Sequence, residues 1–360
     1  MNNIFTNRLD KIYKSLVKNS YDGLYITNLT NIRYLTGFTG SAGLLIILKN
    51  TSYFLTDGRY IQQSKEQIQD SKIIIIKSSY FQSISDNKIL NNKNLNIAFE
   101  SNHMSFSYYS ELSKFFSNIK WVSTDSIVED IAAIKDDSEI ESLQTAIEIT
   151  DYVFTEIIPE IKVGVTEKYI ATRISYLFKM NGAEGDSYES IIAGGPRSAL
   201  PHARPSDREF INGDFIVMDF GALYNGYHAD MTRTLVVGTP TSRHKEIYNI
   251  VLESHLNGIN TAQAGIPCCD VDLACRSIIE NKSYGEYFTH STGHGIGLEV
   301  HTLPRIHKTN QELLKLNHVI TIEPGIYIPD WGGVRIEDDC LIELNGCKPL
   351  NKSSKELIIV

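Results

Sequence analysis

The sequence has few features of secreted or membrane-spanning proteins. Only five of its 360 residues are cysteines, and no two of them form a Cys-x-x-Cys pair. A small, odd number of cysteines argues against a framework of disulfide bonds. The longest apolar runs, such as Ile73–Ile76, are far shorter than the roughly 20 residues that cross a bilayer. We therefore expect free thiols and no membrane partner.

Basic residues are also in the minority. The chain has 34 lysines and arginines against 43 aspartates and glutamates, for a net charge of −9. Nucleic-acid partners call for a basic face, so we expect none here. The first residues contain no apolar core of the length found in signal peptides. These absences together favour a cytoplasmic enzyme.

The length and patterning of the chain indicate two domains, since 360 residues exceed the usual size of one. In the first part, short apolar strands alternate with helical patterns and predict a compact α/β domain; these strands are Gly23–Ile26, Leu44–Leu48, Tyr53–Leu55 and Ile73–Ile76. Near Asp136 the pattern changes to a long amphipathic helix. We place the domains at residues 1–128 and 129–360 and expect an α/β (α+β) fold class.

A β-hairpin is the clearest local signal in the second part. Two apolar strands flank an Asn-Gly pair, a strong two-residue turn signal. Such a turn pairs Tyr224 with Tyr227, and the same register puts Asp230 opposite Gly221. Because side chains alternate with a period of two, Asp219 and Asp230 then project from one face as diagonal neighbours.

Carboxylates in apolar surroundings recur downstream. Glu323 follows a strand-like Val-Ile-Thr-Ile run, and Glu337 follows Val-Arg-Ile. An ionised carboxylate in such a setting is costly unless it is paired or bound to a cation. His294 lies nearby in a glycine-rich segment, where the backbone can approach a site closely. We therefore predict a binuclear metal site formed by Asp219, Asp230, His294, Glu323 and Glu337.

The ligand types narrow the choice of metal. Oxygen donors with one imidazole and no thiolate suit Mn²⁺, Co²⁺ and Fe²⁺ as well as Zn²⁺. We expect two divalent metal ions, with Mn²⁺ favoured. The sequence contains no His-Glu-x-x-His motif, which excludes the zinc-protease site built on a single helix.

Six short motifs occur in order in the second part; they are Ser198–His202, Met218–Gly221, Asp230–Thr234, His290–Gly297, Ile322–Gly325 and Gly333–Glu337. Together they resemble the proline-specific metallopeptidase family, which includes Xaa-Pro aminopeptidase (aminopeptidase P) and Xaa-Pro dipeptidase (prolidase). Asn31–Phe38 and Thr56–Tyr60 resemble the family's non-catalytic domain. The resemblance implies a C-terminal pita-bread catalytic domain, as in creatinase and methionine aminopeptidase, with a smaller creatinase-like α/β domain before it. It also implies a homodimer or a higher homo-oligomer.

The resemblance further implies a role for each ligand. Asp219 would chelate one metal, and His294 and Glu323 would bind the other. Asp230 and Glu337 would bridge the two ions. Such a metal pair activates a water for attack on a carbonyl, and Glu323 would accept the proton of that water.

Other site residues also follow from the resemblance. The family's active-site histidines correspond to His202, His290 and His301, and its supporting arginine corresponds to Arg335. We expect His202 and His301 to stabilise the oxyanion or steer the substrate. His290 would line the proline pocket or support its loop. Strand alternation puts Arg335 on the same face as Glu337, where it can orient that ligand.

The two peptidase activities differ in how the pocket ends. A prolidase neutralises a carboxylate just beyond proline, whereas aminopeptidase P leaves room for a longer peptide. Arg305 would either bind such a carboxylate bidentately or remain a solvated loop residue. We favour Xaa-Pro aminopeptidase acting on proline-containing peptides, with Xaa-Pro dipeptidase as the alternative. A non-catalytic pita-bread binding module is a distant third, because five intact ligand positions fit it poorly.

Overall fold

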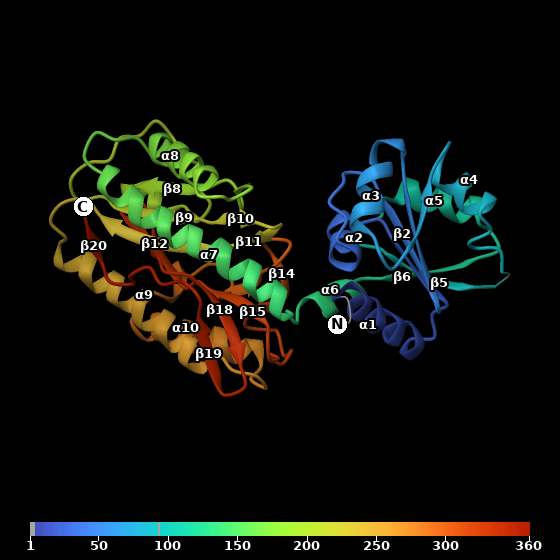
Figure 1. Cartoon of the computed structure of the whole chain (residues 1–360). Helices are drawn as coiled ribbons and strands as arrows, with labels where there is room; N and C mark the ends of the chain where they lie inside the picture. The colour runs from blue at the N-terminus through green and yellow to red at the C-terminus, as the bar shows by residue number, and fades with distance from the viewer. Residues whose placement is uncertain (1–3, 93) are drawn as a thin grey trace. The chain divides into compact units, whose positions relative to one another are not determined.

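The computed structural model describes residues 4–92 and 94–360, which form two compact units. One unit ends at Ala132, and the other spans Ala133–Val360. Both units mix helices and strands (Figure 1), which confirms the predicted α/β class. Residues 1–3 and 93 of the predicted first domain lie outside the described residues.

The first unit contains a six-stranded sheet with the order β4-β3-β2-β1-β5-β6. Its strands are β1 (Gly23–Ile26), β2 (Leu44–Leu48), β3 (Thr51–Thr56), β4 (Lys72–Ile75), β5 (Asn96–Glu100) and β6 (Lys120–Thr124). Its helices are α1 (Ile4–Lys18), α2 (Leu29–Thr36), α3 (Ile61–Gln67), α4 (Tyr80–Asp86), α5 (Phe106–Phe115) and α6 (Ile127–Ala132), with a 3₁₀ turn η1 (Gly58–Tyr60). The bounds predicted for β1 and β2 are confirmed.

The second unit has two pairs of helices, which lie on either side of its strands (Figure 1). One pair is α7 (Asp137–Ile157) and α8 (Glu167–Met180); the other is α9 (Ser242–Thr261) and α10 (Cys268–Asn281). The predicted start of α7 is confirmed, since Asp136 accepts a hydrogen bond from the Glu139 amide and the Glu139 side chain caps Asp136 in return. Short 3₁₀ turns are η2 (Ile158–Glu160), η3 (Gly195–Ala199) and η4 (Gly285–Tyr287).

Two main sheets cross this unit, with the orders β20-β12-β9-β8 and β14-β13-β15-β18-β19. The first contains β8 (Ile191–Gly194), β9 (Phe215–Phe220), β12 (Met231–Val236) and β20 (Ile358–Ile359). The second contains β13 (Gly293–Gly295), β14 (Thr302–Ile306), β15 (Val319–Ile322), β18 (Asp338–Glu343) and β19 (Gly346–Pro349). Smaller sheets pair β16 (Gly325–Ile328) with β17 (Gly332–Arg335), and β10 (Ala222–Tyr224) with β7 (Gly185–Asp186) and β11 (Tyr227–His228).

Each helix pair covers its own apolar core. Residues of α7 and α8 pack on β8, β9 and β12, with Ile170, Phe178 and Met218 fully buried. Residues of α9 and α10 pack on β15–β18, with Val251 and Ile320 fully buried. Burying side chains of this size contributes about 1.5–3 kcal/mol each. The two cores hold the sheets in fixed positions and leave polar side chains between them.

The hairpin register agrees with its prediction. Tyr224 pairs with Tyr227, and the same register continues into β9 and β12, where Asp219 lies opposite Thr232. The observed pairing is therefore the one from which the sequence places Asp219 and Asp230 on the same face of the hairpin. Among the described residues, no helix combines the length and apolar content of a membrane span. All five cysteines are free, as expected.

A buried carboxylate connects three elements of the first unit. Glu100, at the end of β5, accepts hydrogen bonds from the amides of Thr27 and Asn28 at 2.8 and 2.9 Å and from Asn31 Nδ2 at 2.6 Å. Asn31 Nδ2 also donates to Glu129 Oε1 of α6 at 2.7 Å. Burial, opposed by these donors, raises the pKa of Glu100 to about 7.

This carboxyl makes the stability of the first unit dependent on pH. Because its pKa is higher in the folded than in the unfolded chain, the folded state binds more protons. The resulting stabilisation, on the order of 3 kcal/mol, is complete below pH ~4.5 and is lost as the pH rises through about 7. We predict that Glu100→Gln flattens this decline. Thermal midpoints of both proteins between pH 5 and 7.5 check it, and parallel slopes would contradict it.

Candidate metal centre

The five predicted metal ligands come from different strands and line one cavity of about 430 Å³. Asp219 lies in β9, Asp230 directly precedes β12, and His294 is the central residue of β13. Glu323 follows β15, and Glu337 lies between β17 and β18. Both main sheets therefore contribute carboxylates to the same cavity.

Three of these side chains form a tight cluster. Asp230, His294 and Glu337 each offer one potential ligand atom, and these atoms lie within 4.8 Å of one another. His294 Nε2 lies 3.7 Å from an Asp230 oxygen and 3.6 Å from Glu323 Oε1. Asp219 stands at the wall of the same cavity. The set presents four carboxylates and one imidazole.

Glycines let His294 reach this position. A Cβ on Gly293 would lie 1.9 Å from the Thr321 carbonyl oxygen, and a Cβ on Gly295 would lie 2.0 Å from that of Leu303. Any side chain at either position would push β13 away from its neighbours. The glycine-rich sequence around His294 is therefore a packing requirement of the strand that presents the imidazole.

The carboxylates repel one another. Burial, together with the charge of Asp219, raises the pKa of Asp230 well above its ordinary value. Burial and neighbouring carboxylates likewise raise the pKa values of Glu323 and Glu337. Two unit charges 4.8 Å apart repel by about 3.5 kcal/mol at an effective dielectric constant of ~20.

A bound cation would relieve this repulsion and keep the carboxylates ionised. Burial lowers the pKa of His294 to about 3, so its imidazole is neutral and available as a ligand. Oxygen-rich donor sets with a single imidazole are typical of divalent metal sites. The residues present thus fit divalent metal ions.

Hydrogen bonds of Arg335 link two of the predicted ligands, Asp219 and Glu337. Its Nη2 donates to Asp219 Oδ2 at 2.5 Å, and its Nε donates to Thr232 Oγ1 at 3.0 Å. The Thr232 hydroxyl donates in turn to Glu337 Oε2 at 2.6 Å. Arg335 Nη1 donates to the Tyr327 hydroxyl at 2.7 Å. Arg335 therefore contacts Asp219 directly and reaches Glu337 through Thr232.

The other predicted site residues, His202, His290, His301 and Arg305, line the same cavity. His202, His301 and Arg305 are exposed, whereas His290 is half-buried. His290 Nε2 lies 2.9 Å from the Tyr327 hydroxyl, and burial lowers the pKa of His290 to about 4. The rim of the cavity is therefore open to solvent, and its floor is formed by the buried carboxylates.

Three residues that contact predicted site residues were not themselves predicted from the sequence: Tyr188, Thr232 and Tyr327. The Tyr188 hydroxyl lies within hydrogen-bond distance of both Asp219 Oδ1, at 2.5 Å, and Asp230, and its single proton can be donated to either. For Thr232 a signal existed, because the predicted register puts it directly opposite Asp219. No local pattern marks Tyr188 or Tyr327, whose roles depend on which strands meet.

Family models match both units of the chain. The model described as metallopeptidase family M24 matches residues 141–343, and that of the creatinase/prolidase N-terminal domain matches residues 8–134. The expected creatinase-like domain, followed by a pita-bread catalytic domain, is thereby confirmed.

Individual relatives match nearly the whole chain. The chain is 40% identical to an Xaa-Pro dipeptidase of Pyrococcus furiosus over 98% of its own length and 99% of that protein. An Xaa-Pro dipeptidase structure from Bacillus anthracis matches with a TM-score of 0.96 and 38% identity, covering 99% of this chain and all of that one. An X-Pro aminopeptidase structure from Thermotoga maritima matches with a TM-score of 0.90 and 36% identity, covering 98% and 99%. The chain belongs to metallopeptidase family M24 and is a metallopeptidase.

Proposed function

We propose that this metallopeptidase is an Xaa-Pro dipeptidase, which hydrolyses the bond before a C-terminal proline. The preference for an aminopeptidase drawn from the sequence gives way, because the comparisons fit the dipeptidase alternative better. The structural observation that carries the proposal is Arg305, whose side chain shares the cavity with the carboxylate cluster. A guanidinium there can bind the free carboxylate of a dipeptide in two-point contact.

We assign metal binding to Asp219, Asp230, His294, Glu323 and Glu337. When bound, two divalent ions supply Lewis-acid activation of a water and of the scissile carbonyl. We propose Mn²⁺ as the metal, with Co²⁺, Fe²⁺ and Zn²⁺ as alternatives that the same donor set can bind. Arg335 and Thr232 keep the carboxylates oriented toward the ions through the hydrogen bonds described above.

The protein's own groups move the protons and bind the substrate. Glu323 accepts a proton from the attacking water and returns it to the proline nitrogen, which has no N–H of its own. His202 and His301, at the open rim, stabilise the oxyanion and steer the substrate. His290, held by Tyr327, lines the pocket for the proline ring. In this scheme Arg305 fixes the end of the substrate, so that the scissile carbonyl lies near Glu323.

We further propose that residues 129–360 carry out catalysis and that residues 1–128 form a non-catalytic domain. The five free cysteines support a reducing, cytoplasmic location. The partners are proline-containing dipeptides and, by the family resemblance, a second copy of the chain. Light scattering at micromolar concentration should give the mass of a homodimer, and a monomer mass would refute this assembly.

Recognition of the terminal carboxylate separates the two peptidase activities. We predict that Ala-Pro is cleaved with a kcat/KM at least ~10-fold higher than Ala-Pro amide, because a charged hydrogen bond contributes about 1.5–3 kcal/mol. Ala-Pro-Ala should be a poor substrate.

Arg305→Met should abolish the preference for the carboxylate over the amide. In the control Arg204→Met, which removes a cavity arginine already paired with Glu189, the preference should persist. Efficient cleavage of Ala-Pro-Ala would instead support the aminopeptidase.

The role of Glu323 in proton transfer can be separated from its role in metal binding. We predict that Glu323→Gln lowers kcat by at least ~100-fold, the usual contribution of a general base, even in samples that elemental analysis shows to be fully loaded with metal. Turnover near the wild-type level in loaded Glu323→Gln would rule out this role. Wild-type protein that takes up no divalent metal would overturn the proposed centre itself.

A further inference from the structure

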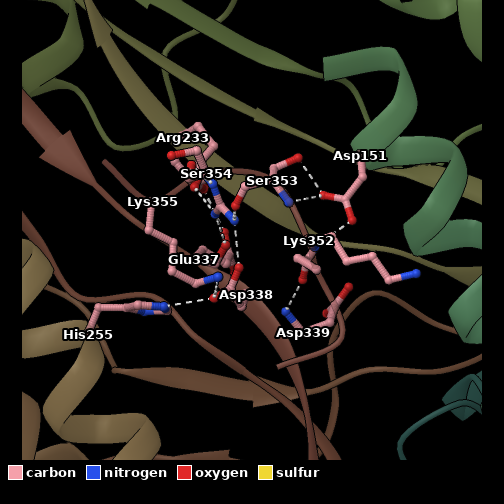
Figure 2. A network of polar contacts seen from close by, with 12 residues as sticks. Asp151, Arg233, His255, Glu337, Asp338, Asp339, Lys352, Ser353, Ser354 and Lys355 are labelled. Carbon is pink, nitrogen blue, oxygen red and sulfur yellow. Dashed lines mark hydrogen bonds and ion pairs between the residues drawn. The ribbon is translucent and has the colours of Figure 1, made fainter. Parts of the chain in front are cut away.

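Arg233 is a buried side chain with unusually many partners. It lies in β12, its side chain is 1% exposed, and its guanidinium contacts several carbonyl oxygens (Figure 2). Nη1 donates to the carbonyls of Thr232 and Glu337 at 2.9 and 2.6 Å. Nε and Nη2 donate to the carbonyls of Ser354 and Ser353, each at 3.0 Å. The guanidinium therefore joins β12, the Glu337 segment and the segment Leu350–Lys355, called here the C-terminal strap.

These contacts involve backbone groups in the segments that carry two of the proposed metal ligands. Asp230 comes immediately before β12, and Glu337 comes immediately before β18, so each adjoins a different main sheet. The Glu337 amide donates to the Thr232 carbonyl at 3.1 Å. Arg233 donates to this same Thr232 carbonyl and to the carbonyl of Glu337. Arg233 therefore adds a side-chain link between the two sheets at this point, beside the direct backbone contact between Glu337 and Thr232.

Asp338 holds that guanidinium in place. Arg233 Nη2 donates to Asp338 Oδ1 at 2.7 Å, and the Asp338 side chain is fully buried. Its other oxygen lies 2.9 Å from His255 Nε2 and 2.9 Å from Lys355 Nζ. Figure 2 shows His255 and Lys355 reaching Asp338 from different segments. Rotation of the carboxylate would break these contacts, so Arg233 has a single favourable orientation.

A second link ties the same region to Asp230. The Asp230 amide donates to Asp339 Oδ2 at 2.9 Å, and the Asp339 amide donates to Asn351 Oδ1 of the C-terminal strap at 2.7 Å. Buried ion pairs contribute little net stability compared with apolar side chains of similar volume. What an apolar side chain could not supply at position 233 is directional contact with the Thr232 and Glu337 carbonyls.

We propose that Arg233, oriented by Asp338, is a positioning residue that sets the spacing of Asp230 and Glu337 and thereby the affinity of the site for its metal ions. The inference rests on the proposed ligand set. Lysine in place of Arg233 would keep the charge beside Asp338. It would lose the planar fork that reaches four carbonyls at once.

The test measures metal binding by the full-length protein. Wild-type and Arg233→Lys proteins are stripped with a chelator and titrated with Mn²⁺ by calorimetry, and their Co²⁺ forms are compared by visible absorption. We expect Arg233→Lys to bind Mn²⁺ about 10–100-fold more weakly, the usual effect of losing a group that orients a ligand, and to show an altered Co²⁺ spectrum. Excess Mn²⁺ should restore much of its turnover.

Asp151→Asn is the matched control. Asp151 accepts hydrogen bonds from the amides of Lys352 and Ser353 at 2.7 and 3.0 Å, so it anchors the same strap without contacting a ligand segment (Figure 2). This variant should lose thermal stability yet bind Mn²⁺ within about twofold of wild type.

Three outcomes are separable. If folded Arg233→Lys binds Mn²⁺ as wild type does, or if Asp151→Asn weakens binding equally, the positioning role is refuted. Should Arg233→Lys not fold, Asp338→Asn, which keeps the guanidinium, is judged by the same criteria. Failure of the wild-type protein to bind Mn²⁺ or Co²⁺ at all would instead refute the proposed metal site.

Discussion

The repulsion among buried carboxylates is the constraint on which the rest of the second unit depends. Asp219, Asp230, Glu323 and Glu337 line one cavity, and burial raises the pKa values of Asp230, Glu323 and Glu337. Such a group is tolerated only where cations or directed hydrogen bonds offset the cost. The fold supplies Arg335 beside Asp219 and the Thr232 hydroxyl beside Glu337, and divalent ions bound at the proposed site would supply further positive charge. Metal ions bound at the proposed site would therefore offset the repulsion among its carboxylates.

The floor and the rim of the cavity differ in solvent exposure. The proposed ligands at its floor lie in strands or directly beside them and are buried, apart from the partly exposed Glu323, whereas His202, His301 and Arg305 at the rim are solvent-exposed. Rigid strands keep the spacing of the carboxylates, which metal binding requires within narrow limits. Under the proposed function, the exposed side chains at the rim would be free to close on a small, charged peptide. The rim residues, and not the metal ligands, would then select which peptides are cleaved.

Much of this was predictable from local pattern, because local chemistry fixes it. The Asn-Gly turn sets the register of the hairpin, and the period of two then puts Asp219 and Asp230 on one face. Asp136 with Glu139 specifies a helix start by direct hydrogen bonding. By contrast, Tyr188 reaches Asp219 only because β9 and the loop before β8 meet in space, and no spacing rule encodes that meeting. The choice between dipeptidase and aminopeptidase depends on the wall of the cavity and was equally out of reach of sequence pattern.

The C-terminal strap has a consequence for how the site comes into being. Arg233 bonds to the carbonyl of Glu337, 104 residues later, and Asp151 to the amide of Lys352, 201 residues later. During synthesis a chain emerges from the ribosome N-terminus first, so Asp219 and Asp230 are exposed long before their partners exist. A chain that ends before residue 337 lacks one of the proposed ligands, and a chain that ends before residue 350 lacks the strap that Arg233 and Asp151 bind. The proposed metal centre is therefore among the last parts of the second unit that can be completed during synthesis.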